Sequence, residues 1–157
     1  MAYYIKDSED YWDRYPDRFA GMRVVNAQVS PSTMHVLGDL DVDTTPVALI
    51  FTMPADFELV RHSHDCERFE IILEGSLYSK EADLWLHVGD IMRVQPGEMY
   101  GPHIAGAEGC RTLEVFSTVT GATWADVELP NGEIVRVNMA KPSDLTDAGL
   151  YTDTIAH

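Results

Sequence analysis

Short runs of apolar residues are separated by turn-forming residues along most of the chain. Runs rich in Val, Ile, Phe, Tyr and Thr occupy residues 22–29, 33–40, 47–53, 57–64, 68–79, 83–95, 110–119, 126–129 and 133–137. Branched and aromatic side chains at this close spacing favour β-strands, and no helical runs alternate with them. The pattern therefore predicts a single all-β sandwich or barrel.

Helical signals are confined to the two ends of the chain. Residues 8–19 predict a short helix that begins at Ser8, whose side chain can cap the first turn. Residues 142–150 predict a second short helix that ends at Gly149. We expect both segments to lie outside the barrel.

The last two apolar runs are joined by Pro130-Asn131-Gly132. Asn-Gly readily adopts the positive φ angles of a type I′ turn, so these residues predict a β-hairpin. No repeat, low-complexity tract or linker divides the chain, and 157 residues suffice for one buried core. We predict one domain over residues 1–157, with a core of about 22–138.

Composition restricts the classes of partner and compartment. The 26 acidic and 11 basic residues give a formal net charge of -15. Nucleic acids and anionic membrane surfaces require a basic footprint, so we expect neither as a partner. The N-terminal stretch is polar and charged, unlike a signal peptide, and no apolar stretch approaches the ~18 residues of a membrane span. Cys66 and Cys110 are too few for a disulfide framework, which favours free thiols and a cytoplasmic protein.

Candidate chemistry begins with two histidines spaced by one residue, His62 and His64. Strand residues two apart share a face at a spacing of ~6.5–7 Å, so both imidazoles can converge on one metal ion. If the chain turns through residues 65–67, Glu70 begins a neighbouring antiparallel strand, and its carboxylate adds an oxygen ligand. The alternative is that the histidines lie on a solvated edge and the glutamates are surface charge.

The wider pattern resembles the two motifs of the cupin superfamily. H-x-H, a later glutamate and a glycine after a strand, within residues 62–75, resemble the first motif. GDIMRVQPGEMYGPH, residues 89–103, resembles the second: a Gly-Asp turn, a short strand, Pro-Gly and a histidine. The resemblance covers about residues 45–118. It implies a jelly-roll barrel (a double-stranded β-helix) and, as in many cupins, one divalent metal held inside by three histidines and a glutamate.

The first motif departs from the family pattern at its glutamate. The family places that glutamate three or four residues after the second histidine, and Arg68 stands there after three. Glu67 comes one residue earlier, and Glu70 comes two residues later. We favour Glu70 as the ligand, because it opens the next strand on a face that can turn inward. Glu74, beside the turn glycine, is expected to face solvent.

The second motif departs at its histidine. Tyr100 occupies the expected position, and His103 follows three residues later. A loop through residues 98–102 can bring His103 to the metal. Alternatively, Tyr100 points inward as a ligand or as an acid/base group above the metal. The predicted metal ligands are His62, His64, Glu70 and His103.

Such a site implies a metalloenzyme that acts on a small organic molecule. An oxygenase with Fe(II) is the favoured reading; Mn(II), Ni(II) or Zn(II) would instead suit a metal-dependent isomerase or lyase. Tyr100 is the first candidate for proton transfer, if a metal lowers its pKa. Alternatives are a sensor or binding module without turnover, and a metal-free barrel that binds a sugar or metabolite. From the family we also expect a homodimer, in which residues 22–29 and 33–40 cover a sheet edge of the second subunit.

Overall fold

The computed structural model describes residues 30–36, 39 and 41–150, and for residues 30–36 it describes the backbone alone. Its strands are β1 (Ser30–Val36), β2 (Val47–Met53), β3 (Glu58–Leu59), β4 (His62–His64), β5 (Arg68–Ser79), β6 (Leu84–His87), β7 (Ile91–Val94), β8 (His103–Phe116), β9 (Trp124–Glu128) and β10 (Ile134–Asn138). Two short helices within the same residues are α2 (Val119–Thr123) and α3 (Pro142–Asp147). The prediction of an all-β fold is confirmed.

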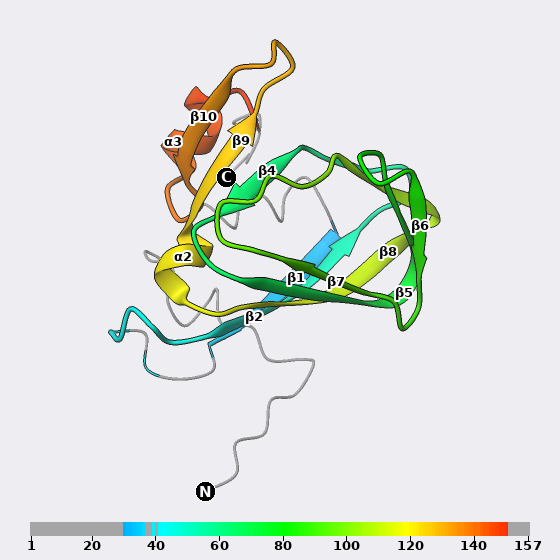
Figure 1. Ribbon diagram of the computed structural model, residues 1–157, viewed down its shortest axis with the longest axis horizontal. Helices are drawn as coiled ribbons and strands as arrows, with labels where there is room; N and C mark the ends of the chain where they lie inside the picture. The colour runs from blue at the N-terminus through cyan, green and yellow to red at the C-terminus, as the bar shows by residue number, and fades with distance from the viewer. Residues whose placement is uncertain (1–29, 37–38, 40, 151–157) are drawn as a thin grey trace, which may run out of the picture.

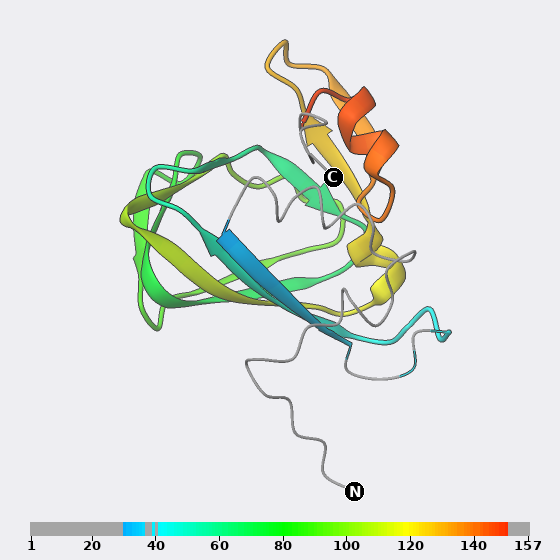
Figure 2. The same cartoon turned by 180° about the vertical axis from the view of Figure 1, so that it is seen from behind.

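The strands form two antiparallel sheets. The large sheet has the order β1-β2-β8-β5-β6, with β3 also paired to β8 and β7 to β5. The small sheet has the order β10-β9-β4. Figure 1 shows β2, β4, β5, β7 and β8 surrounding one interior, with β10 and α3 to one side of it. From behind, β1 lies alongside β2 at the edge of the large sheet (Figure 2).

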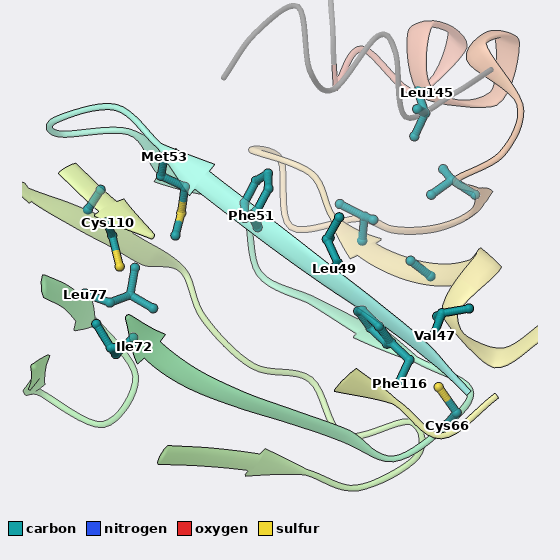
Figure 3. Close-up of a cluster of buried hydrophobic side chains, with 14 of the residues drawn as sticks. Val47, Leu49, Phe51, Met53, Cys66, Ile72, Leu77, Cys110, Phe116 and Leu145 are labelled. Atoms are coloured by element: carbon teal, nitrogen blue, oxygen red, sulfur yellow. The ribbon is translucent and has the colours of Figure 1, made fainter. Parts of the chain in front are cut away.

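Alternation along β2 builds one wall of the core. Val47, Leu49, Phe51 and Met53 are all buried, whereas the residues between them on the strand are on the other face. Figure 3 shows Met53 pointing toward Ile72 and Leu77 of β5, and all of these side chains belong to one buried apolar cluster with Phe116. Burying large apolar side chains stabilises a fold by ~1.5–3 kcal/mol each, so this face fixes the position of β2 against β5 and β8.

Several predicted runs have different boundaries in the structure. The runs 47–53 and 68–79 coincide with β2 and β5. The run 83–95 divides into β6 and β7, because Gly89 adopts a φ of +91° in the turn between them. Strand β8 begins at His103 rather than at residue 110, since residues 103–105 pair with β3 and β5 although the Gly- and Ala-rich stretch that follows them carries little strand signal.

The hairpin between β9 and β10 is confirmed, but its predicted turn type is wrong. Gly132 has a φ of +82°, whereas Asn131 is not among the described residues with positive φ. The N–H of Gly132 donates to the carbonyl of Leu129 at 2.8 Å. A type I′ turn requires positive φ at both central residues, so this loop instead places a single left-handed glycine after an ordinary turn.

The two ends of the chain are only partly described. Helix α3 lies within the predicted helix 142–150, and its Leu145 is fully buried in the main apolar cluster, so the core continues past residue 138. The predicted helix 8–19 and the segment 22–29 lie outside the described residues, and the homodimer stays a prediction. Within the described residues, no helix has the length and apolar character to span a bilayer.

Candidate functional site

Strand β4 carries the two predicted histidines and is held along both of its edges. On one edge His62 and His64 pair in register with Val127 and Ala125 of β9. On the other, the backbone N–H and C=O of His62 exchange hydrogen bonds of 3.0 and 2.9 Å with Tyr100. The two imidazole centroids lie 5.3 Å apart, edge to face. The prediction that the two rings share one side of a strand is therefore confirmed.

Hydrogen bonds fix the proton positions on both rings. Nδ1 of His62 lies 2.8 Å from the carbonyl oxygen of Val60, and Nδ1 of His64 lies 3.2 Å from that of Trp124. A carbonyl oxygen can only accept, so each Nδ1 carries the hydrogen and each neutral ring keeps a lone pair on Nε2. The Tyr100 hydroxyl lies 2.7 Å from Nε2 of His62 and donates to it.

The first residue of β5, Arg68, is buried inside the barrel. Arg68 is 1% exposed. Its Nε donates to Oε2 of Glu114, and its Nη2 to Oε2 of Glu70, both at 2.8 Å. Its Cζ lies 4.7 Å from the centroid of the Tyr100 ring. Because Glu70 and Glu114 face each other in register on β5 and β8, one guanidinium joins the two strands.

The glutamates divide between the inside and the outside of the barrel. Glu70 is 2% exposed, and it lies on the inward face of β5 with Arg68. Glu67 is exposed and forms an ion pair with Arg93 on the outer surface. Glu74 is also exposed, as expected. Of the two carboxylates that the sequence leaves open, the structure brings Glu70 and not Glu67 to the histidines' side.

Both aromatic candidates of the second motif also lie inside. Tyr100 is 6% exposed and His103 is 1% exposed, and their ring centroids are 5.8 Å apart. Tyr100 contacts His62 through its hydroxyl and lies against the guanidinium of Arg68. His103 begins β8. Tyr100 is thus the member of the second motif that contacts both His62 and Arg68.

The local electrostatics keep the histidines and the tyrosine uncharged. Burial, with the neighbouring His64, lowers the pKa of His62 well below its usual value. Burial, and then the charge of Arg68, lowers the pKa of His64 to about 4. Burial opposes the charge of Arg68, yet the carboxylates raise the pKa of Arg68 well above its usual value. Burial also raises the pKa of Tyr100.

The depressed pKa of His64 predicts that the fold is sensitive to acid. The unfolded chain binds a proton at this histidine near pH 6.5, whereas the folded chain does so only near pH 4. Between these values the unfolded state binds more protons, so the free energy of unfolding falls as the pH falls. We expect a loss of roughly 3 kcal/mol from His64 over this window, measured by urea unfolding between neutral pH and pH 4.

A matched pair of variants isolates this effect. Burial raises the pKa of Glu114, which stabilises the fold as the pH falls and so has the opposite sign. His64→Asn should reduce the dependence of stability on pH, whereas His87→Asn, at an exposed position of β6, should leave it at the wild-type value. Equal dependence on pH in the wild-type protein and His64→Asn would contradict the assignment.

The cupin resemblance implies a divalent metal, which would need free donor groups inside the barrel. No group of three or more His, Cys, Asp or Glu side chains within the described ranges is arranged to hold a metal ion. The carboxylate of Glu70 is bound by Arg68, and Nε2 of His62 accepts from Tyr100. The ligand set His62, His64, Glu70 and His103 stays a prediction, but the residues as arranged do not fit a metal.

The sequence does not single out Arg68 or Glu114 as site residues. A signal for Arg68 is present in the sequence. It stands at the glutamate position of the first motif, and it lies on the same face of the strand as Glu70 and Ile72. Glu114 has no such signal. Both faces of its strand carry apolar residues, so alternation does not tell which face is inside.

Comparisons with known proteins identify the fold. No protein-family model and no curated protein matches the sequence. Among solved structures, the chain is similar to an acetylacetone dioxygenase from Acinetobacter johnsonii, with a TM-score of 0.52, 14% identity and 76% of each chain covered. It is also similar to a candidate acetylacetone dioxygenase from Methylibium petroleiphilum, with a TM-score of 0.51, 11% identity, and 88% of this chain and 92% of that chain covered.

A third similar structure is an RmlC-like cupin from Ralstonia eutropha, with a TM-score of 0.49, 17% identity, and 78% of this chain and 77% of that chain covered. Identities this low establish a shared fold and not a shared activity. The chain has the cupin fold, as the two sequence motifs predict.

Proposed function

We propose that this protein is a cupin that binds a small organic molecule inside its barrel by hydrogen bonds, without a resident metal. The observation that carries the proposal is the position of Arg68. It stands where the first motif would place the metal-binding glutamate, and its guanidinium is bound to Glu70 and Glu114. A fixed positive charge is thus built into the barrel by the chain itself.

The second departure from the family pattern supports the same proposal. Tyr100 stands where the second motif would place a metal-binding histidine, and its ring lies beside the Arg68 guanidinium. Its hydroxyl also occupies the lone pair of His62 that a metal would need. Arg68 and Tyr100 each stand in place of a metal ligand of the family pattern, and their side chains contact each other. The two departures from the pattern therefore act together.

The donors available favour binding and polarisation over oxygenation. A guanidinium can donate to a ligand oxygen and polarise a carbonyl group, and the Nε2 lone pair of neutral His64 can accept a proton. A site for Fe(II) that activates dioxygen needs free imidazole and carboxylate donors, and here Glu70 is bound by Arg68 and His62 by Tyr100. The dioxygenase activity named for two of the similar structures is thus not carried over to this chain.

Metal analysis tests the proposal. We expect tag-free protein, purified after expression without added salts, to contain far less than one equivalent of Fe, Mn, Ni or Zn by mass spectrometry. Anaerobic incubation with Fe(II) followed by desalting should leave this content unchanged. An oxygen electrode should record no uptake when acetylacetone is added to the Fe(II)-treated protein. A stoichiometric metal, or oxygen uptake that depends on Fe(II), would refute the metal-free proposal and restore the metalloenzyme.

A further inference from the structure

Three buried polar atoms have no hydrogen-bond partner in the part of the chain that the structure describes. They are Nη1 of Arg68, Nε2 of His103 and Oγ1 of Thr112. All three residues are at most 1% exposed. Buried polar groups are nearly always satisfied, and leaving one unsatisfied costs ~1–3 kcal/mol. A molecule bound beside these atoms can supply the missing partners.

The three atoms belong to one polar region of the interior. Thr112 and Glu114 are both buried, two residues apart on β8, so they share its inward face, and Glu114 binds Arg68. His103 lies 5.8 Å from Tyr100, measured between ring centroids, and Tyr100 lies against the guanidinium of Arg68. A molecule that contacts Arg68 therefore lies next to Glu114, which shares a strand face with Thr112. It also lies next to Tyr100, whose ring neighbours that of His103.

The hydrogen-bonding capacity of this region restricts the chemistry of its ligand. Nη1 of Arg68 can only donate, so it needs a ligand oxygen that accepts. The hydroxyl of Thr112 can donate and accept, and the lone pairs left on Glu70 and Glu114 can only accept while these groups are ionised. A matching ligand offers both hydroxyl donors and oxygen acceptors.

The charge of the region restricts the ligand further. One guanidinium faces two carboxylates, and the neighbouring histidines are neutral. A ligand carboxylate or phosphate would add negative charge where carboxylates already outnumber the cation, and it would bring no donors. A ligand ammonium would place a second cation beside Arg68.

Resting on the proposed function, we infer that the ligand is a neutral polyhydroxy or hydroxycarbonyl compound, such as a sugar, whose oxygens bind Nη1 of Arg68 and Oγ1 of Thr112. Arg68 is then the principal recognition residue, and Thr112 supplies specificity through a hydroxyl with no role in the fold. Nε2 of His103 completes the polar lining.

Ligand-observed NMR with probes matched in shape but not in charge tests this inference. The probes are aldoses of four to six carbons, the corresponding aldonates and the corresponding amino sugars, each titrated against the wild-type protein. We expect at least one neutral aldose to bind, with its aldonate and its amino sugar at least about tenfold weaker, which corresponds to ~1.4 kcal/mol.

Three variants connect binding to the named atoms. Thr112→Val removes a hydroxyl that has no protein partner, so its melting temperature should equal or exceed that of the wild-type protein while aldose affinity falls about tenfold. Arg68→Met should abolish binding. Thr44→Val, at an exposed position before β2, should change neither affinity nor stability.

Each outcome decides the inference. Tighter binding of aldonates than of aldoses, unchanged affinity in Thr112→Val, or no binding of any neutral aldose would overturn it. The first of these results would leave the proposed metal-free binding function standing. A stoichiometric metal in the purified protein would instead refute the proposed function, whatever the sugars do.

Discussion

Replacing Arg68 by glutamate and Tyr100 by histidine together is expected to create a divalent-metal site inside the barrel. The change removes the buried cation and restores both ligand types that the cupin motifs call for. Nε2 of His62 would lose the hydrogen bond from the Tyr100 hydroxyl, and Nε2 of His64 already carries a lone pair. The double variant would offer the imidazoles of His62 and His64, a third imidazole at position 100 and a carboxylate at position 68. This set suits Zn(II), Mn(II) or Fe(II).

Thermal unfolding with and without metal measures this gain. Without metal, R68E/Y100H should be less stable than the wild-type protein, because its buried carboxylates have lost their cation. At a free metal concentration of about 100 times the dissociation constant, binding adds ~2.7 kcal/mol. For a chain of this size, that gain raises the melting temperature by about 5–10 °C. The same addition of metal should not change the melting temperature of the wild-type protein.

The single variants and one further substitution serve as controls. R68E and Y100H alone should each bind metal more weakly than the pair, because each restores only one ligand. Adding His64→Ala to the pair should abolish the shift. Equal metal-dependent shifts in the wild-type protein and the double variant would contradict the role assigned to Arg68. The proposal would also fail if the double variant folds, retains both histidines on β4 and binds no metal.

Much of the fold can be predicted from the sequence because its strands carry strong alternation. Strand β2 is recognised at both ends, since a run of apolar and branched residues lies between the turn-forming Pro46 and Pro54. The start of β8 is not, because residues 105–109 are mostly Gly and Ala, and the strand conformation of residues 103–105 depends on pairing with β3 and β5. Local propensity is weak evidence where distant partners supply the hydrogen bonds.

The candidate site is predicted only in part, for a physical reason. The shared face of His62 and His64 follows from the two-residue period of a strand, and the structure confirms it. Glu70 is buried, on the face that the same period assigns to it. The same period places Arg68 on the face of Glu70. The role of a charged residue at a core position cannot be predicted until the residues that bind it are known. One of those partners, Glu114, lies 46 residues away along the chain. The sequence shows which side chains can meet, whereas the pairing of charges decides what they bind.

Arg68→Met is expected to cost the fold about 3–5 kcal/mol, since it leaves Glu70 and Glu114 buried without a compensating charge. Methionine keeps most of the apolar stem of arginine, so the loss reports mainly on the charge and its hydrogen bonds. Urea unfolding at neutral pH measures the effect. Arg93→Met is the matched control, because Arg93 is paired with Glu67 on the exposed face and should contribute only ~0–1 kcal/mol.

The triple variant R68M/E70Q/E114Q separates a loss of charge balance from a loss of packing. Replacing all members of a buried ion cluster by uncharged groups of similar size is often neutral or stabilising, so most of the stability lost in Arg68→Met should return. A loss in Arg68→Met no larger than that in Arg93→Met would show that the buried guanidinium is not needed to balance the two carboxylates. A triple variant as unstable as the single one would assign the loss to packing. Recovery in the triple variant would instead establish that the chain holds two carboxylates in its core only because Arg68 stands between them.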